Sequence, residues 1–166
     1  MRLAAALLVC LASILIGFSQ AARLKKRRAA LEEFQRVLIE IKGLLKYENA
    51  STDAIFRKIE QLRLPYLGTF FTKWRIYSEK SDPAAALKKA AAELPDCLLK
   101  DDRALFQKLG AFLGRSDAQT QIELCTQLAE KCNAMLAEYE RDHGNLTGLY
   151  QKLGILIGIG AAILIL

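Results

Sequence analysis

The sequence is poor in the residues that catalytic sites use. His143 is the only histidine, and the four cysteines form no CxxC pair. Phosphate loops, dinucleotide-binding turns, HExxH zinc motifs and GxSxG nucleophile motifs are absent as well. One histidine with scattered cysteines supplies no zinc ligand set. We therefore expect no enzyme activity, no cofactor and no metal, and we interpret His143 as a residue at a helix end, where its positive form would suit the helix dipole.

Four acidic residues stand in adjacent pairs, Glu32 with Glu33 and Asp101 with Asp102. A catalytic acid and base need two environments that separate their pKa values. Acids near the start of a helix instead meet the positive end of its dipole. We interpret both pairs as solvated helix starts.

The cysteines give no indication of disulfides. Cys10 lies in the first apolar run, and Cys125 and Cys132 are seven positions apart in a helical pattern. Two helical turns separate their Cα atoms by about 10 Å, which is beyond the reach of a disulfide. We therefore expect reduced thiols that pack as small apolar groups.

The sequence has no surplus of positive charge beyond its first 28 residues. The formal net charge is +6, and the stretch after Arg28 contains 18 basic and 18 acidic residues. A nucleic-acid binder spreads basic residues over its binding face, so we expect no nucleic-acid partner. Five basic residues follow the first apolar run and form a predicted membrane-boundary basic patch: Arg23, Lys25, Lys26, Arg27 and Arg28.

The first apolar run, Leu3 to Ala22, contains only three polar side chains and is long enough to cross about 30 Å of hydrocarbon. A cleaved signal peptide is the alternative, with Arg2 as its positive start and cleavage after Ala21. One basic residue precedes the run and five follow it by Arg28, and the side richer in Lys and Arg stays in the cytoplasm. We therefore predict an uncleaved transmembrane helix at residues 1–22, with the amino terminus outside.

The last 14 residues, from Leu153, are all Leu, Ile, Gly or Ala, but a helix of that length covers only about 21 Å. Extension back to Leu146 adds a turn and lets the Lys152 amine reach the headgroups. A buried or surface-lying helix is the alternative, although a run without a polar face has no amphipathic moment to hold it flat. We predict a second transmembrane helix at residues 146–166. Small residues at four-residue intervals in both runs would let spans pair within one chain or in a homo-oligomer.

The region between the spans, residues 23–145, is predicted to be one helical domain in the cytoplasm. Apolar residues recur at intervals of three and four, no stretch alternates with period two, and Gly and Pro stand mainly at breaks. These patterns predict an all-α fold, a six-helix cytoplasmic bundle flanked by N- and C-terminal transmembrane helices. Five aromatic residues, Trp74 among them, are expected to be core rather than a binding surface. The expected helices cover residues 29–47, 55–62, 66–77, 83–95, 101–113 and 116–139.

One short segment, Leu109 to Gln119, is predicted to be a tight corner between two helices. We expect its two glycines to share one face, the second of them to end the first helix, and Ser116 with Gln119 to form a capping box for the next. Arg115 and Asp117 have no obvious local role, so a partner contact and an internal ion pair both stay open. The candidate residues of this corner are Gly110, Gly114, Arg115, Ser116, Asp117 and Gln119.

The same corner carries a resemblance to a known family. Its sequence LGAFLGRSDAQTQ resembles the LGxxLGxSD hallmark, with a following glutamine, of the stage III sporulation protein AB family of endospore-forming bacteria. The apolar start with Gly17 and Phe18, the basic Arg23, the helix through Tyr47 and the ending LYQKLGILIGIGAAILIL are similar in order and place. The resemblance spans nearly the whole chain. Residues 49–53 depart from it, because a proline-containing turn is expected there.

The resemblance implies a component of the channel complex between mother cell and forespore, located in the mother-cell-derived membrane. The family's helical body is similar to the cytoplasmic domains of the platform protein of type II secretion and type IV pilus machines. Such platforms couple a cytoplasmic secretion ATPase to the assembly, so the implied partners are the stage III sporulation protein AA ATPase, other sporulation channel subunits and the lipid membrane. A membrane-anchored helical regulator and a secreted helical binding protein, both unrelated to secretion machinery, are the alternatives.

Overall fold

The protein is described by a computed structural model that covers residues 2–81, 83–114 and 116–143, together with residues 156 and 160. Within these ranges, the side chains of residues 2–11, 14, 83, 84, 142 and 143 are not described. The described chain is helical and contains no strand, which confirms the prediction of an all-helical fold. It divides into two compact units, one of residues 1–26 with 137–166 and one of Arg27–Leu136.

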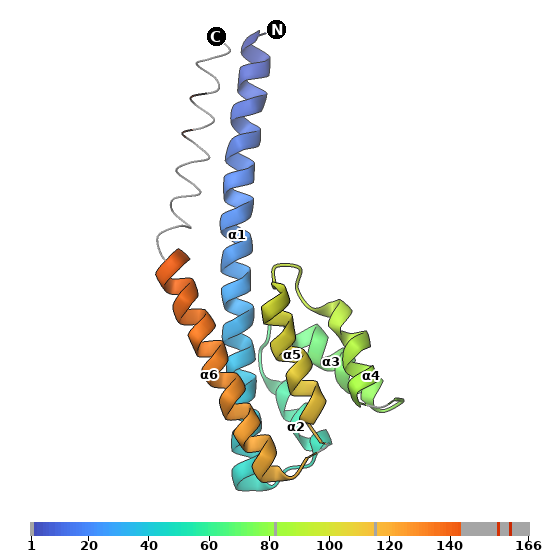
Figure 1. Cartoon of the computed structure of the whole chain (residues 1–166). Helices are drawn as coiled ribbons and strands as arrows, with labels where there is room; N and C mark the ends of the chain where they lie inside the picture. Colours follow the sequence, from blue (N-terminus) through green and yellow to red (C-terminus); the bar gives the residue numbers. More distant parts are fainter. Residues whose placement is uncertain (1, 82, 115, 144–155, 157–159, 161–166) are drawn as a thin grey trace. The chain divides into compact units, whose positions relative to one another are not determined.

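The described elements follow one another with short connections (Figure 1). They are α1 (Arg2–Gly43), the π-helical turn η1 (Leu44–Glu48), α2 (Thr52–Gln61), α3 (Gly68–Ser78), α4 (Pro83–Ala90), the 3₁₀ turn η2 (Ala91–Glu93), α5 (Lys100–Phe112) and α6 (Ala118–His143). The hydrophobic spacing thus located every helix of the second unit to within a few residues. The boundaries 1–22, 23–145 and 146–166 of the predicted domains stay predictions.

The two membrane spans also stay predictions. No helix in the part of the chain that the structure describes is both long enough and apolar enough to cross a membrane. Of the predicted span at residues 1–22, the structure describes a helical backbone from Arg2 onward but only part of the side chains. The predicted span at residues 146–166 lies outside the described residues, apart from Leu156 and Gly160.

The core of the second unit forms where α1 contacts α5 and α6. Leu31, Phe34 and Leu38 of α1 are fully buried on one stripe of that helix. The ring of Phe34 lies against that of Phe106 in α5, with 4.1 Å between the ring centroids. The Cys132 thiol of α6 donates to the Leu31 carbonyl at 3.4 Å. These contacts join α1 to two helices that come much later in the sequence.

Aromatic residues of α3 complete this core: Phe70, Phe71 and Trp74 are buried as predicted, whereas Tyr77 is half-buried and Tyr66, also predicted to be core, is exposed. Trp74 is 1 % exposed and meets the edge of the Phe56 ring at 5.0 Å between centroids. Phe70 reaches from the same helix to Phe106, with 5.5 Å between centroids. Edge-to-face pairs of this kind add about 1 kcal/mol each beyond the burial of their area. The aromatic cluster therefore joins α2, α3 and α5.

The thiols of α6 are buried, and the predicted absence of a disulfide between Cys125 and Cys132 is confirmed. Leu128 of α6 is buried with the two thiols, and Ile122 and Leu136 of the same helix are half-buried and pack against the core. Cys10 lies outside the described side chains.

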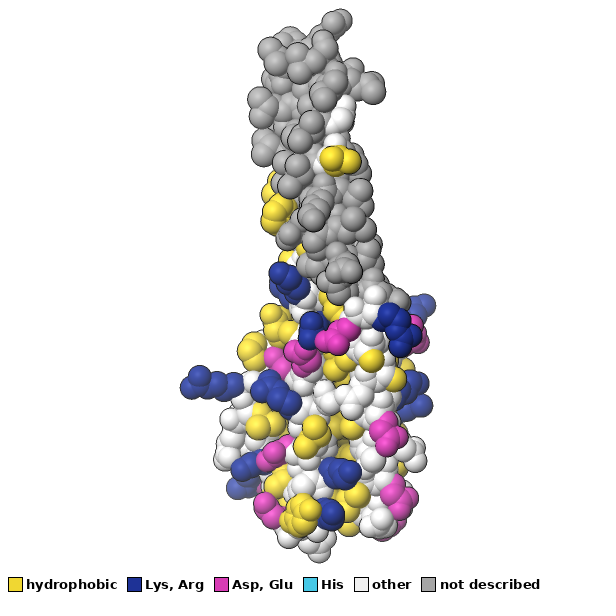
Figure 2. Space-filling model, turned by 90° about the vertical axis from the view of Figure 1, so that its left-hand side faces the viewer, with side chains coloured by type: hydrophobic (Ala, Val, Ile, Leu, Met, Phe, Trp, Pro, Cys, Tyr) yellow, Lys and Arg dark blue, Asp and Glu magenta, His cyan; other side chains and the backbone are white. Residues whose placement is uncertain are grey.

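The surface of the molecule carries charges of both signs. On the face that Figure 2 shows, basic and acidic side chains alternate, and apolar side chains appear between them. This face has no continuous basic area of the kind that binds nucleic acid.

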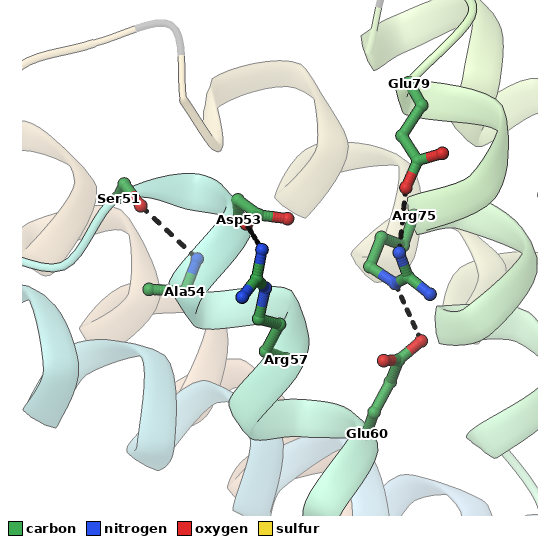
Figure 3. Close-up of polar contacts among 7 residues, drawn as sticks. All are labelled: Ser51, Asp53, Ala54, Arg57, Glu60, Arg75 and Glu79. Atoms are coloured by element: carbon green, nitrogen blue, oxygen red, sulfur yellow. Dashed lines mark hydrogen bonds and ion pairs between the residues drawn. The ribbon is translucent and has the colours of Figure 1, made fainter.

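The chain leaves the helical conformation between η1 and α2 only at residues 49–51, since Thr52 and Asp53 already belong to α2, and this break is built without proline. Asn49 adopts a left-handed conformation with φ 46°, and its amide donates to the Leu44 carbonyl. Asparagine tolerates this conformation better than most residues. The Ser51 hydroxyl then accepts a hydrogen bond from the Ala54 amide at 3.3 Å and caps α2 (Figure 3).

An ion pair connects the end of α2 to α3, and two further ion pairs join residues four positions apart. Arg75 of α3 contacts Glu60 of α2 at 2.8 Å and Glu79 at 2.8 Å, and Arg57 contacts Asp53 at 2.8 Å (Figure 3). The hydrogen bond to the Glu60 carboxylate raises the pKa of the Arg75 guanidinium. The Arg57–Asp53 pair is exposed, and exposed pairs of this kind contribute little to stability.

Candidate interaction site

The segment between α5 and α6 is a corner in which glycine is needed at one position. The last residue of α5 is Phe112, and Gly114 has a φ of +76°. A Cβ at Gly114 would lie 2.6 Å from the Oγ1 atom of Thr52, the first residue of α2. The left-handed conformation and the close approach of α2 therefore both exclude a larger residue.

The second glycine of this segment has a different role from the one predicted. Gly110 lies inside α5 and is buried, while Gly114 lies beyond the end of that helix, so the expectation that they share one helix face is wrong. A Cβ at Gly110 would lie 2.5 Å from one methyl group of Leu87 and 2.8 Å from the other. Gly110 thus lets α4 pack closely against α5.

The start of α6 is capped by Asp117, so the predicted capping box of Ser116 with Gln119 is wrong. The Asp117 carboxylate accepts hydrogen bonds from the Thr120 amide at 3.0 Å and the Thr120 hydroxyl at 2.6 Å. These bonds hold the pKa of Asp117 below its ordinary value, the hydroxyl contributing most. Gln119 donates to Glu123 instead, at 3.0 Å. Both Ser116 and Asp117 can cap a helix, and the pattern did not distinguish two such residues in adjacent positions.

Gln121, which the sequence analysis missed, braces the corner from inside. Its side chain is 7 % exposed. The amide nitrogen donates to the Ser116 carbonyl at 2.6 Å, and the amide oxygen accepts from the Gly114 amide at 3.2 Å. A polar residue four positions before Cys125, on the buried stripe of α6, was the signal that could have identified it. Arg115 lies outside the described residues, so a partner contact and an internal ion pair both stay open for it.

The predicted basic patch lies partly on the surface and partly against the interior of the fold. Arg23, Lys25 and Lys26 are exposed on α1. Arg28 forms an exposed pair with Glu32 at 2.8 Å. Arg27 instead binds a carboxylate that is fully buried, that of Asp102 in α5. At least one of the five positive charges is therefore paired with a buried carboxylate of the fold.

Asp102 and Glu33 contradict the interpretation of the paired acids as solvated helix starts, because the second acid of each pair is buried. Asp102 accepts from the Leu99 amide at 2.7 Å, closing the first turn of α5, as well as from Arg27. Glu33 accepts from the Tyr66 amide at 3.1 Å and the Leu67 amide at 2.9 Å. It thereby caps the start of α3 from α1.

Burial raises the pKa of Glu33 above its ordinary value, although hydrogen bonds from the Leu67 and Tyr66 amides and the charge of Arg36 act in the opposite direction. The buried carboxylates thus accept hydrogen bonds from backbone amides or from Arg27. Glu33 binds amides at the start of α3, and Asp102 binds an amide at the start of its own helix as well as Arg27, so the geometry of both acids is that of structural caps. Among the described side chains, no group of three or more His, Cys, Asp or Glu residues could hold a metal ion.

Among the grooves on the described part of the second unit, two lie along α6. The first lies between α5 and α6, has a volume of about 450 Å³ and has Lys108 and Lys131 in its wall. The second, of about 460 Å³, lies between α6 and the end of α1 with η1, and it has both lysines and glutamates in its wall. Grooves of this size fit the side chains of a partner or a small ligand.

The comparisons with known proteins agree with the resemblance found in the sequence. A family model described as stage III sporulation protein AB matches residues 2–166. No curated protein and no solved structure matches the chain. Since the family match extends over the whole chain and not over the corner alone, the chain belongs to the stage III sporulation protein AB family and has a role in sporulation.

Proposed function

We propose that this chain is a membrane-embedded structural subunit of the channel complex between mother cell and forespore, and that it acts as a platform that binds a cytoplasmic secretion ATPase. The match to the sporulation family over residues 2–166 is the observation that carries this proposal. The ATPase partner, the stage III sporulation protein AA ATPase, and the neighbouring channel subunits follow from the resemblance to secretion platforms.

The sequence supports a membrane location for this subunit. Both ends of the chain are apolar over about the length of a membrane span, and basic residues follow the first end. In the first unit, Leu15, Ile16 and Phe18 expose their apolar side chains. Transfer of such side chains from water into lipid lowers the free energy. In this proposal, the protein crosses the mother-cell-derived membrane twice, and its helical body faces the cytoplasm.

The polar contacts of the second unit support a function through binding rather than through chemistry. Glu33, Asp102 and Gln121 are the buried polar side chains of the described chain, and each is bonded to the backbone or to an arginine. An acid or base in a reaction needs a group that can reach a substrate. The body would therefore act by binding partners at its exposed surfaces and in the two grooves.

Membrane topology is the experiment that tests this proposal first. Lys80 is exposed in the loop after α3, so Lys80→Cys, combined with Cys10→Ser and Cys97→Ser, gives a reporter thiol. Labelling by an impermeant maleimide only after the cells are permeabilised is the expected result, and the chain without Lys80→Cys is the control. Labelling of intact cells would place the body outside and refute the platform. Mass measurement of the amino terminus distinguishes cleavage after Ala21, which the secreted alternative requires.

The ATPase partner needs a separate test, because a membrane-anchored regulator would have the same topology. The full chain in mild detergent should co-purify with the stage III sporulation protein AA ATPase. Arg115 remains a proposed partner contact of the corner, so Arg115→Ala should lower the recovery of a partner without changing the melting temperature. Absence of the ATPase from the purified wild-type chain would leave the regulator as the better function.

A further inference from the structure

The groove between α5 and α6 is formed by one stripe of each helix. Its residues recur at intervals of three and four, so they face the same side of their helices. They are Lys108, Ala111 and Phe112 from α5, and Leu124, Gln127, Leu128 and Lys131 from α6.

This groove has an apolar end and a basic end. The helices α5 and α6 run in opposite directions from their shared corner (Figure 1). Phe112 and Leu124 are the lining residues nearest the corner in sequence, and Lys108 and Lys131 are the farthest from it. Lys108 stands one turn, about 6 Å, from Phe112, and Lys131 stands two turns, about 10 Å, from Leu124. On each of the two helices, therefore, the lysine is the lining residue farthest from the corner.

The charge of the groove is uncompensated in the part of the chain that the structure describes. No acidic residue lines it, and neither Lys108 nor Lys131 forms an ion pair with a described side chain. The neighbouring groove is different, because Lys42 and Lys46 line it together with Glu123 and Glu130. Of these two grooves, the α5–α6 groove is therefore the one that selects for a ligand of negative charge.

We propose that the α5–α6 groove binds an amphipathic helix of a partner protein, which seats an apolar side chain beside Phe112 and Leu124 and a carboxylate between Lys108 and Lys131. The spacing along α5 and α6 places the carboxylate of the partner four to seven residues from its apolar anchor. This inference rests on the proposed function, since it gives a subunit that works through contacts a defined docking surface.

A helix fits these features better than an anionic membrane does. Helices bind grooves by inserting apolar residues at intervals of three and four. A lipid surface would meet the two lysines with its phosphates, but its headgroup plane would not fill the hollow between Phe112 and Leu128. Lipid binding is the competing outcome of the experiment.

Site-specific photo-crosslinking of the full chain in sporulating cells tests the proposal. The photoreactive residue replaces Ala111, which is exposed in the groove wall, and the control replaces Ala85, an exposed alanine of α4. The same experiment is made with Lys108→Glu plus Lys131→Glu and, as the matched charge control, with Lys88→Glu plus Lys89→Glu on α4. Thermal melts of each variant verify folding.

The expected crosslink from position 111 maps to a helix that has an Asp or Glu four to seven residues from an apolar residue. Reversal of Lys108 and Lys131 should lower its yield by about tenfold or more, whereas the α4 control should not, and an acid-to-lysine change in the partner should restore it. A crosslink to lipid, a crosslinked segment without a carboxylate, no crosslink, or an unchanged yield after charge reversal would each overturn the proposal.

Failure of the groove proposal can be distinguished from failure of the proposed platform function. If the wild-type chain co-purifies with the ATPase but position 111 captures no acidic helix, the groove proposal fails and the platform stands. If position 111 captures an acidic helix of another channel subunit and the ATPase does not co-purify, the groove proposal stands and the ATPase partner fails.

Discussion

The guanidinium of Arg27 makes two hydrogen bonds to the carboxylate of Asp102, which lies 75 positions later in the chain. The Nε–Oδ2 distance is 2.7 Å and the Nη2–Oδ1 distance is 2.9 Å. The Asp102 side chain is fully buried and that of Arg27 is 15 % exposed. A bidentate pair with parallel hydrogen bonds is the geometry that best compensates the loss of water around a buried charge. The pair therefore fixes α1 against the first turn of α5.

Arg27→Ala should destabilise the protein by about 3 kcal/mol, because it leaves the Asp102 charge buried without its partner. Arg28→Ala is the matched control, since its exposed pair with Glu32 is worth about 0.5 kcal/mol or less. Denaturant unfolding of the full-length chain in mild detergent, followed by circular dichroism, measures both. Equal losses of stability for the two variants would show that the buried pair stabilises the fold no more than the exposed pair does.

Gly114→Ala should destabilise the protein by about 1–2 kcal/mol, because alanine is strained at positive φ, and the contact with Thr52 adds to this loss. Gly114→Leu should destabilise it further. Gly43→Ala is the control, because Gly43 has helical angles and open space around its Cβ position. It should stabilise the helix by about 0.5–1 kcal/mol. A neutral Gly114→Ala would refute the assignment of the left-handed corner.

The helices could be predicted from the sequence because their signal is local. Apolar residues at intervals of three and four appear within each helix, and Trp74 could be recognised as core from the aromatic residues around it. The corner could be located for the same reason, since Gly114 is a natural stop for a helix. Its cap and its brace by Gln121 could not, because they depend on which of several polar residues turns inward.

The buried acids could not be predicted, because their partners are distant in the sequence. Glu33 looked like a solvated acid, and its amide partners at Tyr66 and Leu67 come 33 and 34 positions later. Asp102 looked the same, and its partner Arg27 was assigned to the membrane boundary. A carboxylate is buried only when tertiary contacts supply its donors, and those contacts leave no local pattern.

The free energy of unfolding of the wild-type protein, relative to that of Glu33→Gln, should increase as the pH falls from 7 toward 4.5. Its pKa is raised in the folded state above the ordinary value of 4.5, so the folded state takes up a proton before the unfolded state does. Denaturant unfolding of both proteins at several pH values measures the difference. Glu32→Gln is the control, because solvent hydrates that exposed carboxylate. A difference that stays constant or falls over this range would contradict the burial of Glu33.

Cys125 and Cys132 should resist thiol reagents at pH 8 until the protein unfolds. Burial raises the pKa of each thiol to about 12, and the Asp102 charge contributes at Cys132. The thiolate is the reactive form, and it is scarce far below the pKa. With Cys10→Ser and Cys97→Ser in place, maleimide labelling should be slow in the folded chain and complete in denaturant. Adding Lys80→Cys provides an exposed thiol as the internal standard for rate. Labelling of the two α6 thiols as fast as this standard would mean that α6 does not pack its buried stripe against α1.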